Sequence, residues 1–321
     1  MSTPSEEILL QQDKNRFVIF PVKHHDIWDW YKKLELNLWT LDPAQTTEEL
    51  EVRKPRSAKA EIEYLNNLLA FFAGTQKKVT ENLSKNIQNK IALPEAGFSI
   101  NLLLQAENVH LQAFSVFSRI WTQTPREEKK LVTAVAPRLQ KLEKFISKYS
   151  KNASFGELLV ASAAFNAIFF STGLSILIFL KKKNIMPGLS NYCDQISRDK
   201  SLHRNLVIDL FNDYLQEKVP AEKARQIIIG TRNLSLEIFL NDFPVSLIEM
   251  QEEHLQQYVN LVTEDLLQNL GFDKNLAEES AVLSESNISL AQSRASKLQQ
   301  NSKKDLKENR EFGKDAISRP Q

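Results

Sequence analysis

Residues 96–121 of this chain read AGFSINLLLQAENVHLQAFSVFSRIW, and this stretch decides the fold. Its apolar side chains recur at helical spacing, which predicts one long helix from about Ala96 to Trp121. Inside it, Glu107 and His110 are three residues apart, so their side chains share a helical face and can point at one site. A Glu-x-x-His pair of this kind supplies two of the six ligands of a two-metal site inside a helical bundle.

The rest of such a site is defective in this sequence. A second Glu-x-x-His should lie on another helix, and the chain offers Lys200-Ser-Leu-His203, with a cation in place of the carboxylate. Two further helices should contribute one carboxylate each. Gln76, 31 residues before Glu107, and Asn166, 34 residues before Lys200, stand where those carboxylates would be. The pattern therefore predicts the frame of a metal site with few of its ligands.

The rest of the chain also predicts helices. Only eight glycines occur, and the eleven prolines fall mostly between apolar-periodic segments, as is typical of a helical protein. Alternating strand patterns are nearly absent. We expect an all-α bundle with helices at about residues 22–35, 57–88, 95–122, 126–149, 154–183, 189–216, 220–242 and 245–270.

Composition limits the class of protein. The 321 residues are 42% hydrophobic and 25% charged, which is enough for a sizeable globular core. The 41 basic and 40 acidic residues give a net charge of +1, which argues against nucleic acid or an anionic membrane as a partner. A single cysteine, Cys193, excludes an intramolecular disulfide and a cysteine-based zinc cluster. With no secretory signal pattern at the start, we expect a cytoplasmic protein.

Two segments differ from the rest. Residues 158–180 carry no charged side chain, so either a membrane span or a helix buried in the bundle fits. Polar residues such as Ser162 and Thr172 favour the buried helix. Residues 291–321 have eight Lys or Arg against four Asp or Glu, a net charge of +4, which favours a solvated tail over a nucleic-acid-binding arm. We expect a flexible segment at 1–15, one helical domain at 16–274 and a disordered tail at 275–321.

Short motifs along the chain carry a family resemblance. They are Arg16-Phe-Val-Ile-Phe-Pro-Val-Lys23, Ile27-Trp28, Leu38-Trp39-Thr40, Leu69-Ala-Phe-Phe-Ala73, Val79-Thr-Glu-Asn-Leu83, Glu107-Asn-Val-His110, Ile168-Phe-Phe-Ser171, Met186-Pro-Gly-Leu189 and Ile196-Ser-Arg-Asp199. Together they resemble the small, radical-generating subunit of class I ribonucleotide reductase, and its eukaryotic or viral branch most, over roughly Arg16 to Lys274. The resemblance implies a ferritin-like helical fold that dimerises, holds two irons and a tyrosyl radical, and passes oxidising equivalents to a large subunit that reduces ribonucleotides.

The resemblance also assigns a role to each site position. The family's first ligand, an aspartate, falls on Gln76, its third carboxylate on Asn166 and its fourth on Lys200. The other three ligand positions, Glu107, His110 and His203, keep the family's residue types. The family's radical tyrosine falls on Phe114. One carboxylate beside a lysine cannot offset the charge of two hard cations, so we predict no di-iron cofactor. We expect a buried ion pair of Lys200 with Glu107, with hydrogen bonds from the amides of Gln76 and Asn166. A single ferrous ion on Glu107, His110 and His203 is an alternative that Lys200 disfavours by repulsion.

The family's inner hydrogen-bonded relay of Trp, Asp and His falls on Trp39, Asp199 and His110. Because the chain lacks a radical source, the simpler interpretation is that these residues satisfy one another's hydrogen bonds in a buried polar network. The family's tail carries a relay tyrosine and an acidic, aromatic docking peptide, whereas this sequence ends Ser318-Arg-Pro-Gln321. We therefore do not expect docking to a large subunit through such a peptide.

Three functions fit these observations. The first is a small-subunit homologue without its own metal and radical chemistry, which acts as a structural or regulatory partner. It would form a homodimer or pair with an intact small subunit, and the large subunit would be a further partner. The second is an active small subunit with unorthodox metal-free or mononuclear radical chemistry, since the resemblance includes variants with phenylalanine at the tyrosine position or lysine among the ligands. The third is a bundle repurposed for binding outside nucleotide metabolism. We favour the first.

Overall fold

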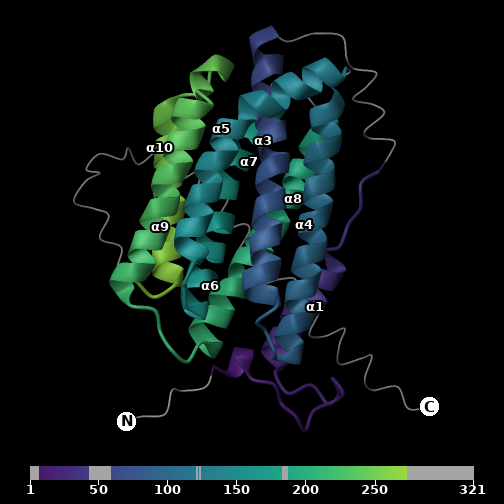
Figure 1. Cartoon of the computed structure of the whole chain (residues 1–321), viewed down its shortest axis with the longest axis vertical. Helices are drawn as coiled ribbons and strands as arrows, with labels where there is room; N and C mark the ends of the chain where they lie inside the picture. Colours follow the sequence, from purple (N-terminus) through teal and green to yellow (C-terminus); the bar gives the residue numbers. More distant parts are fainter. Residues whose placement is uncertain (1–6, 43–58, 121, 123, 183–186, 273–321) are drawn as a thin grey trace. The chain divides into compact units, whose positions relative to one another are not determined.

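The computed structural model describes residues 7–42, 59–120, 122, 124–182 and 187–272. All regular secondary structure in these residues is helical, which confirms the all-α class (Figure 1). The helices are α1 (His25–Leu36), α3 (Lys59–Leu83), α4 (Pro94–Ile120), α5 (Pro125–Ser150), α6 (Phe155–Ala164), α7 (Ser171–Lys182), α8 (Pro187–Asp209), α9 (Ala221–Leu236) and α10 (Glu252–Asn269). The tail expected to be disordered, 275–321, lies outside the described residues, as do residues 1–6.

Several helices continue into π-helical turns, in which the chain is wound more widely than in an α-helix. Such turns extend α3 (Ser84–Gln88), α8 (Leu210–Tyr214) and α9 (Glu237–Asp242). A fourth, Phe165–Phe170, joins α6 to α7 without a break. Asn166 lies in this turn, and π-helical turns inside α-helices often occur at functional sites.

Capping residues fix where two of the helices begin. The Thr124 hydroxyl accepts a hydrogen bond from the backbone N–H of Glu127, whose carboxylate accepts one from the Thr124 N–H. Ser154 and Glu157 form the same reciprocal pair at the start of α6. Each pair satisfies two N–H groups that a helix N-terminus would otherwise leave without partners.

The uncharged stretch at 158–180 lies inside the bundle. It is part of a continuous helical run, Phe155–Lys181, that is long and apolar enough to cross a membrane, but 78% of its most apolar window is buried against other parts of the chain. Phe169 illustrates the packing, since it is fully buried with its ring centroid 6.3 Å from that of Phe71 and 5.3 Å from that of Phe239. This burial accounts for the absence of charge.

Helices α3 and α4 lie side by side, and α1 packs against the lower part of α4 (Figure 1). Helix α8 packs against α4, α6 and α7 and against the π-helical turn between α6 and α7. One side of α3, of α4, of α8 and of this turn therefore faces a common interior. The six positions of the expected metal site all lie on these four elements.

The predicted helix at 245–270 is wrong in its first turns. Val245–Ile248 forms a short 3-10 helix after Pro244, Glu249 has a left-handed backbone with φ of 59°, and α10 begins only at Glu252. The sequence pattern missed this break because Val245 and Ile248 are buried and continue the apolar spacing of α10.

The N-terminal residues are anchored where α4 begins. Within the segment expected to be flexible, Leu9 is fully buried, and its carbonyl accepts hydrogen bonds from the N–H groups of Ala92 and Leu93 at 2.8 and 3.2 Å. Arg16 forms two hydrogen bonds to the Glu95 carboxylate, at 2.8 and 2.7 Å. These contacts hold the N-terminal residues against the first turn of α4.

Candidate functional site

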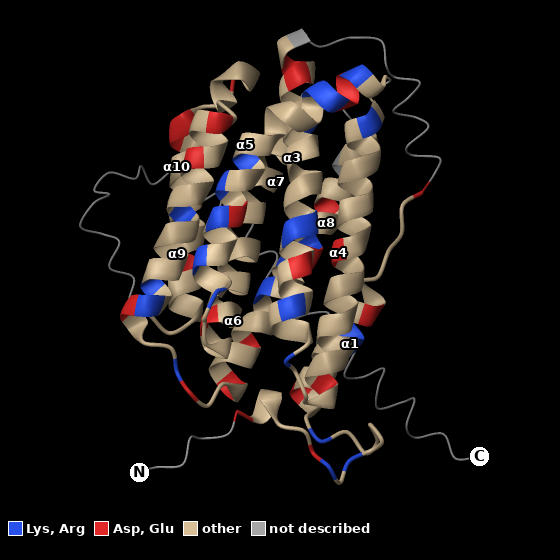
Figure 2. Cartoon of the chain, viewed as in Figure 1, with Lys and Arg blue, Asp and Glu red and all other residues tan. Residues whose placement is uncertain are grey.

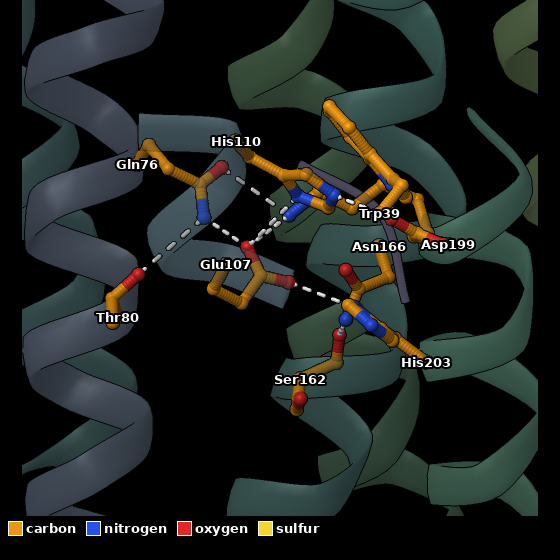
Figure 3. Close-up of polar contacts among 10 residues, drawn as sticks. Trp39, Gln76, Thr80, Glu107, His110, Ser162, Asn166, Asp199 and His203 are labelled. Atoms are coloured by element: carbon orange, nitrogen blue, oxygen red, sulfur yellow. Dashed lines mark hydrogen bonds and ion pairs between the residues drawn. The ribbon is translucent and has the colours of Figure 1, made fainter. Parts of the chain in front are cut away.

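The six positions of the expected metal site lie inside the bundle, and Figure 3 labels five of them, Gln76, Glu107, His110, Asn166 and His203. All are buried, and they come from four elements: Gln76 from α3, Glu107 and His110 from α4, Asn166 from the π-helical turn, and Lys200 and His203 from α8. The three-residue spacing of the two pairs on α4 and α8 turns both members inward, as the sequence predicts.

The expected contact between Lys200 and Glu107 is present. Lys200 Nζ lies 2.6 Å from Glu107 Oε2, and both side chains are 2% exposed. The Gln76 amide completes this group, because its Nε2 donates to Glu107 Oε2 and its Oε1 accepts from Lys200 Nζ at 3.3 Å. The ammonium also lies 3.6 Å from the ring centroid of Phe170. Lys200 is therefore held by a carboxylate, an amide oxygen and an aromatic face.

Asn166 does not join this group as expected. Its Nδ2 donates to the backbone carbonyl of Ser162, four residues earlier, at 3.0 Å, and its Oδ1 is buried with no hydrogen-bond partner among the described residues. The reason is local, since a short amide side chain on a helix competes well for a carbonyl of the preceding turn.

The two histidines bind different carboxylates. His203 Nδ1 lies 2.8 Å from Glu107 Oε1, whereas His110 Nε2 lies 2.8 Å from Asp199 Oδ2. His110 Nδ1, 3.5 Å from Glu107 Oε2, and His203 Nε2 are buried without a hydrogen-bond partner in the described chain. Both Glu107 oxygens are thus already in short contacts with Lys200, Gln76 and His203.

The pKa shifts follow from burial and from this ion pair. Burial alone raises the pKa of Glu107, but the Lys200 ammonium and the neighbouring imidazoles outweigh it and hold the pKa well below its usual value. Burial lowers the pKa of Lys200, and the charge of Glu107 opposes that shift. Burial also lowers the pKa of His203, which favours the neutral imidazole. The six site positions thus hold one buried anion, Glu107, paired with one buried cation, Lys200.

This set of side chains does not fit a di-iron cofactor. Hard divalent and trivalent cations need several anionic oxygen ligands, and the six site positions offer only Glu107, whose charge Lys200 already neutralises. Among the described residues, no three His, Cys, Asp or Glu side chains are placed to hold a metal ion. In the alternative triad of Glu107, His110 and His203, the carboxylate oxygens are already in contact with Lys200, Gln76 and His203.

Phe114 lies one turn beyond His110 and is fully buried. Its ring stacks on Phe72 with centroids 5.0 Å apart and an interplanar angle of 20°. A phenylalanine ring has no hydroxyl that could lose a proton to give a phenoxyl radical.

Trp39, Asp199 and His110 form the expected hydrogen-bonded chain. Trp39 Nε1 donates to Asp199 Oδ2 at 2.7 Å, and His110 Nε2 contacts the same oxygen at 2.8 Å. Sequence reasoning missed Tyr192, which stacks on Trp39 with ring centroids 5.5 Å apart. A signal was available, because Tyr192 precedes Asp199 by seven residues on α8 and so lies on the same helical face.

Comparisons with known proteins identify the family of this chain. A family model described as "Ribonucleotide reductase, small chain" matches residues 16–281. The human ribonucleoside-diphosphate reductase subunit M2 is 33% identical over 290 residues, which cover 89% of this chain and 74% of the relative. The small chain of Trypanosoma brucei brucei is 32% identical over 273 residues, covering 84% of this chain and 81% of that one.

Solved structures agree as well. The ribonucleotide reductase Rnr4 homodimer from Saccharomyces cerevisiae superimposes with a TM-score of 0.73 and 26% identity, covering 89% of this chain and 93% of that one. The R2 subunit from Clostridium botulinum gives a TM-score of 0.71 at 18% identity, covering 84% and 88%, a likeness of fold alone. The fold is ferritin-like, and the chain belongs to the ribonucleotide reductase small-chain family.

Proposed function

We propose that this chain is a small-subunit homologue that carries no di-iron or tyrosyl-radical cofactor of its own and acts as a structural or regulatory partner of reductase subunits. The observation that carries this proposal is the 2.6 Å contact of Lys200 with Glu107, the one carboxylate left among the six site positions. Phe114, at the position of the radical tyrosine, supports it independently. The chain would keep the fold of a small subunit and leave the radical chemistry to another chain.

The partners we propose are a second small-subunit chain, either a copy of this one or an intact homologue, and through it the large subunit. The yeast Rnr4 relative was solved as a homodimer, which supports pairing through a fold of this kind. The proposed compartment is the cytoplasm, where deoxyribonucleotides would be made.

The test is a reconstitution with purified subunits. This chain would be combined with a large subunit, with and without a small subunit that has all its carboxylate ligands and the radical tyrosine, and nucleotide reduction and bound iron would be measured. With this chain as the sole small subunit, we expect no nucleotide reduction and no stoichiometric iron. When this chain is added to the intact small subunit, we expect the rate or the extent of nucleotide reduction to change. Two irons in this chain, or no effect on an intact partner, would contradict the proposal.

The intact chain of Trp39, Asp199 and His110 favours a second candidate, an active subunit that stores an oxidising equivalent without metal. Electron paramagnetic resonance of the isolated chain, together with its activity in the absence of a second small subunit, separates the two. An organic radical signal accompanied by nucleotide reduction would favour the second candidate.

A further inference from the structure

A groove opens on the bundle between the last turn of α5, the start of α6 and α9. Its volume is about 620 Å³, within the range of about 300–1,000 Å³ that small-molecule sites occupy. None of the six site positions lines it. The groove is therefore separate from the interior site, and the family resemblance assigns it no role.

Basic side chains outnumber acidic ones in this groove. Four cations and two carboxylates line it, a net charge of +2 (4 − 2): Lys148, Lys151, Lys223, Arg225, Glu157 and Glu222. Figure 2 shows blue bands along α5 and both blue and red at the lower end of α9. Because the whole chain has a net charge of only +1, this excess of positive charge is a local feature of the groove.

The two carboxylates of the groove are already engaged. Lys223 Nζ lies 3.6 Å from Glu157 Oε1, and Glu222 Oε1 accepts a side-chain hydrogen bond from the next turn of α9 at 3.2 Å. Lys148 and Lys151, in contrast, have no carboxylate partner among the residues that the structure describes. Like charges about one helical turn apart repel each other, so an anion bound to both lysines would be favoured.

One wall of the groove is fixed by Tyr149. Its hydroxyl donates to the backbone carbonyl of Gln226 at 3.2 Å, and its ring packs on Phe145 with centroids 4.7 Å apart. The tyrosine can lie this close to α9 because residue 230 is a glycine, where a Cβ would be 2.8 Å from the Tyr149 hydroxyl oxygen. Lys148 Nζ lies over the same ring, 4.9 Å from its centroid. The ammonium is thus positioned before any ligand binds, which lowers the entropic cost of binding.

The chemistry of this lining suits an anion with several charged oxygens. Each lysine ammonium is a point charge that can bind a phosphate oxygen, and the planar guanidinium of Arg225 matches two phosphate oxygens at once. A single carboxylate would neutralise only one of Lys148 and Lys151. A ligand with two or more phosphates would neutralise both and would fill more of the groove.

We propose that this groove binds a small molecule that carries several phosphate groups, with Lys148, Lys151 and Arg225 holding the phosphates and Tyr149 forming the wall beside them. Lysines near the end of a helix also stabilise its C-terminal dipole. That effect needs no ligand, so a binding measurement separates the two explanations. The inference is independent of the proposed function, which concerns the interior site and the partner subunits.

The experiment is isothermal titration calorimetry of the full chain with three probes: tripolyphosphate, adenosine triphosphate and inositol hexakisphosphate. The probes share clustered phosphates and differ in what carries them, so the tightest of them identifies the source of the ligand. We expect one binding site per chain with a dissociation constant below about 100 μM, and about tenfold weaker binding of sulfate, which is a single dianion. Absence of binding by all three probes, or sulfate binding as tight as theirs, would overturn the inference.

A charge-reversal variant tests whether the probes bind in the groove. In Lys148→Glu/Lys151→Glu we expect the dissociation constant of the tightest probe to rise by about 100-fold, because two charge-assisted contacts are lost. The matched control is Lys77→Glu/Lys129→Glu, which changes the net charge equally at exposed lysines of α3 and α5 outside the groove. It should bind the probe as the unmodified chain does. Equal losses in the two variants would indicate a non-specific effect of charge and would overturn the assignment to the groove.

Gly230→Ala tests the shape of the groove without changing its charge. The added Cβ would displace Tyr149 and, with it, the ammonium of Lys148, so we expect about tenfold weaker binding of the probe. Unchanged binding would contradict the role given to Tyr149. Circular dichroism would establish that each variant is folded. A hexaglutamate peptide that binds more tightly than all three phosphate probes would also overturn the inference, because the groove would then be a site for acidic peptides.

Discussion

Lys200 Nζ and Glu107 Oε2 lie 2.6 Å apart between α8 and α4, with both side chains almost completely buried. Neither group can ionise alone in such an interior without a large desolvation cost, so each depends on the other. The pair also joins three helices, because Gln76 of α3 donates to Glu107 and accepts from Lys200. The ammonium thus links these helices through hydrogen bonds at the place where the family resemblance implies metal ligands.

Removing the lysine should be costly. We expect Lys200→Ala to lower the free energy of unfolding by about 3–5 kcal/mol, because Glu107 would remain buried without its counter-charge. Lys181 is the matched control, since it pairs with Asp194 at 2.6 Å but both side chains are 40% exposed or more. Lys181→Ala should cost less than about 1 kcal/mol. Equal losses in urea denaturation would mean that the Lys200 pair contributes no more than a surface contact.

Restoring the missing carboxylates should restore metal binding. In Gln76→Asp/Asn166→Glu/Lys200→Glu the interior gains three anionic groups and loses its cation, which provides the oxygen ligands that hard metals need. We expect this triple variant to bind stoichiometric ferrous or manganous ion, measured by elemental analysis after desalting, while Lys200→Glu alone binds much less. Equal metal contents for the unmodified chain and the triple variant would contradict the electrostatic explanation.

Short-range spacing predicted the helices and the two site pairs on α4 and α8. The positions of Gln76 and Asn166 came instead from spacings of 31 and 34 residues and from the family resemblance. Glu107 and His110, like Lys200 and His203, must face the same way when they are three residues apart on a helix. The hydrogen bond of Asn166 to Ser162 could not be predicted. The Asn166 amide could have bonded either to a backbone carbonyl of its own helix or to the Lys200–Glu107 pair, and spacing does not distinguish these two partners. The break at Glu249 was also hidden, since a left-handed residue interrupts the helix without interrupting the apolar pattern.

The ion pair of Arg16 with Glu95 should make the free energy of unfolding depend on pH. Burial raises the pKa of Glu95, but the Arg16 guanidinium and backbone N–H groups outweigh it and lower the pKa from 4.5 to about 2. A carboxyl group with a lowered pKa in the folded state stabilises the fold above its unfolded pKa, and this stabilisation is lost as the pH falls from about 4.5 to 2. This pKa shift corresponds to about 3 kcal/mol in the free energy of unfolding.

The variant Glu95→Gln should therefore be less stable than the unmodified chain at pH 7 by up to this amount, and the difference should shrink below pH 4.5. Urea denaturation at a series of pH values measures it. Asp13, which pairs with Lys23 at an exposed position, is the control, and Asp13→Asn should have little effect on the free energy of unfolding at pH 7. A gap between Glu95→Gln and the unmodified chain that persists at pH 2 would contradict the assignment to the Glu95 charge.

Asp199 should also matter for stability, but for a different reason from Lys200. It accepts from Trp39 Nε1 and contacts His110 Nε2, so Asp199→Ala leaves a half-buried indole N–H and a buried imidazole nitrogen without a partner. Each unsatisfied group costs about 1–3 kcal/mol, and we expect a total loss of about 2–4 kcal/mol by urea denaturation. Asp194→Ala, on the exposed side of the same helix, should lose less than about 1 kcal/mol. If Asp199→Ala were as stable as Asp194→Ala, the network of Trp39, Asp199 and His110 would have no structural role, and its retention would favour electron transfer instead.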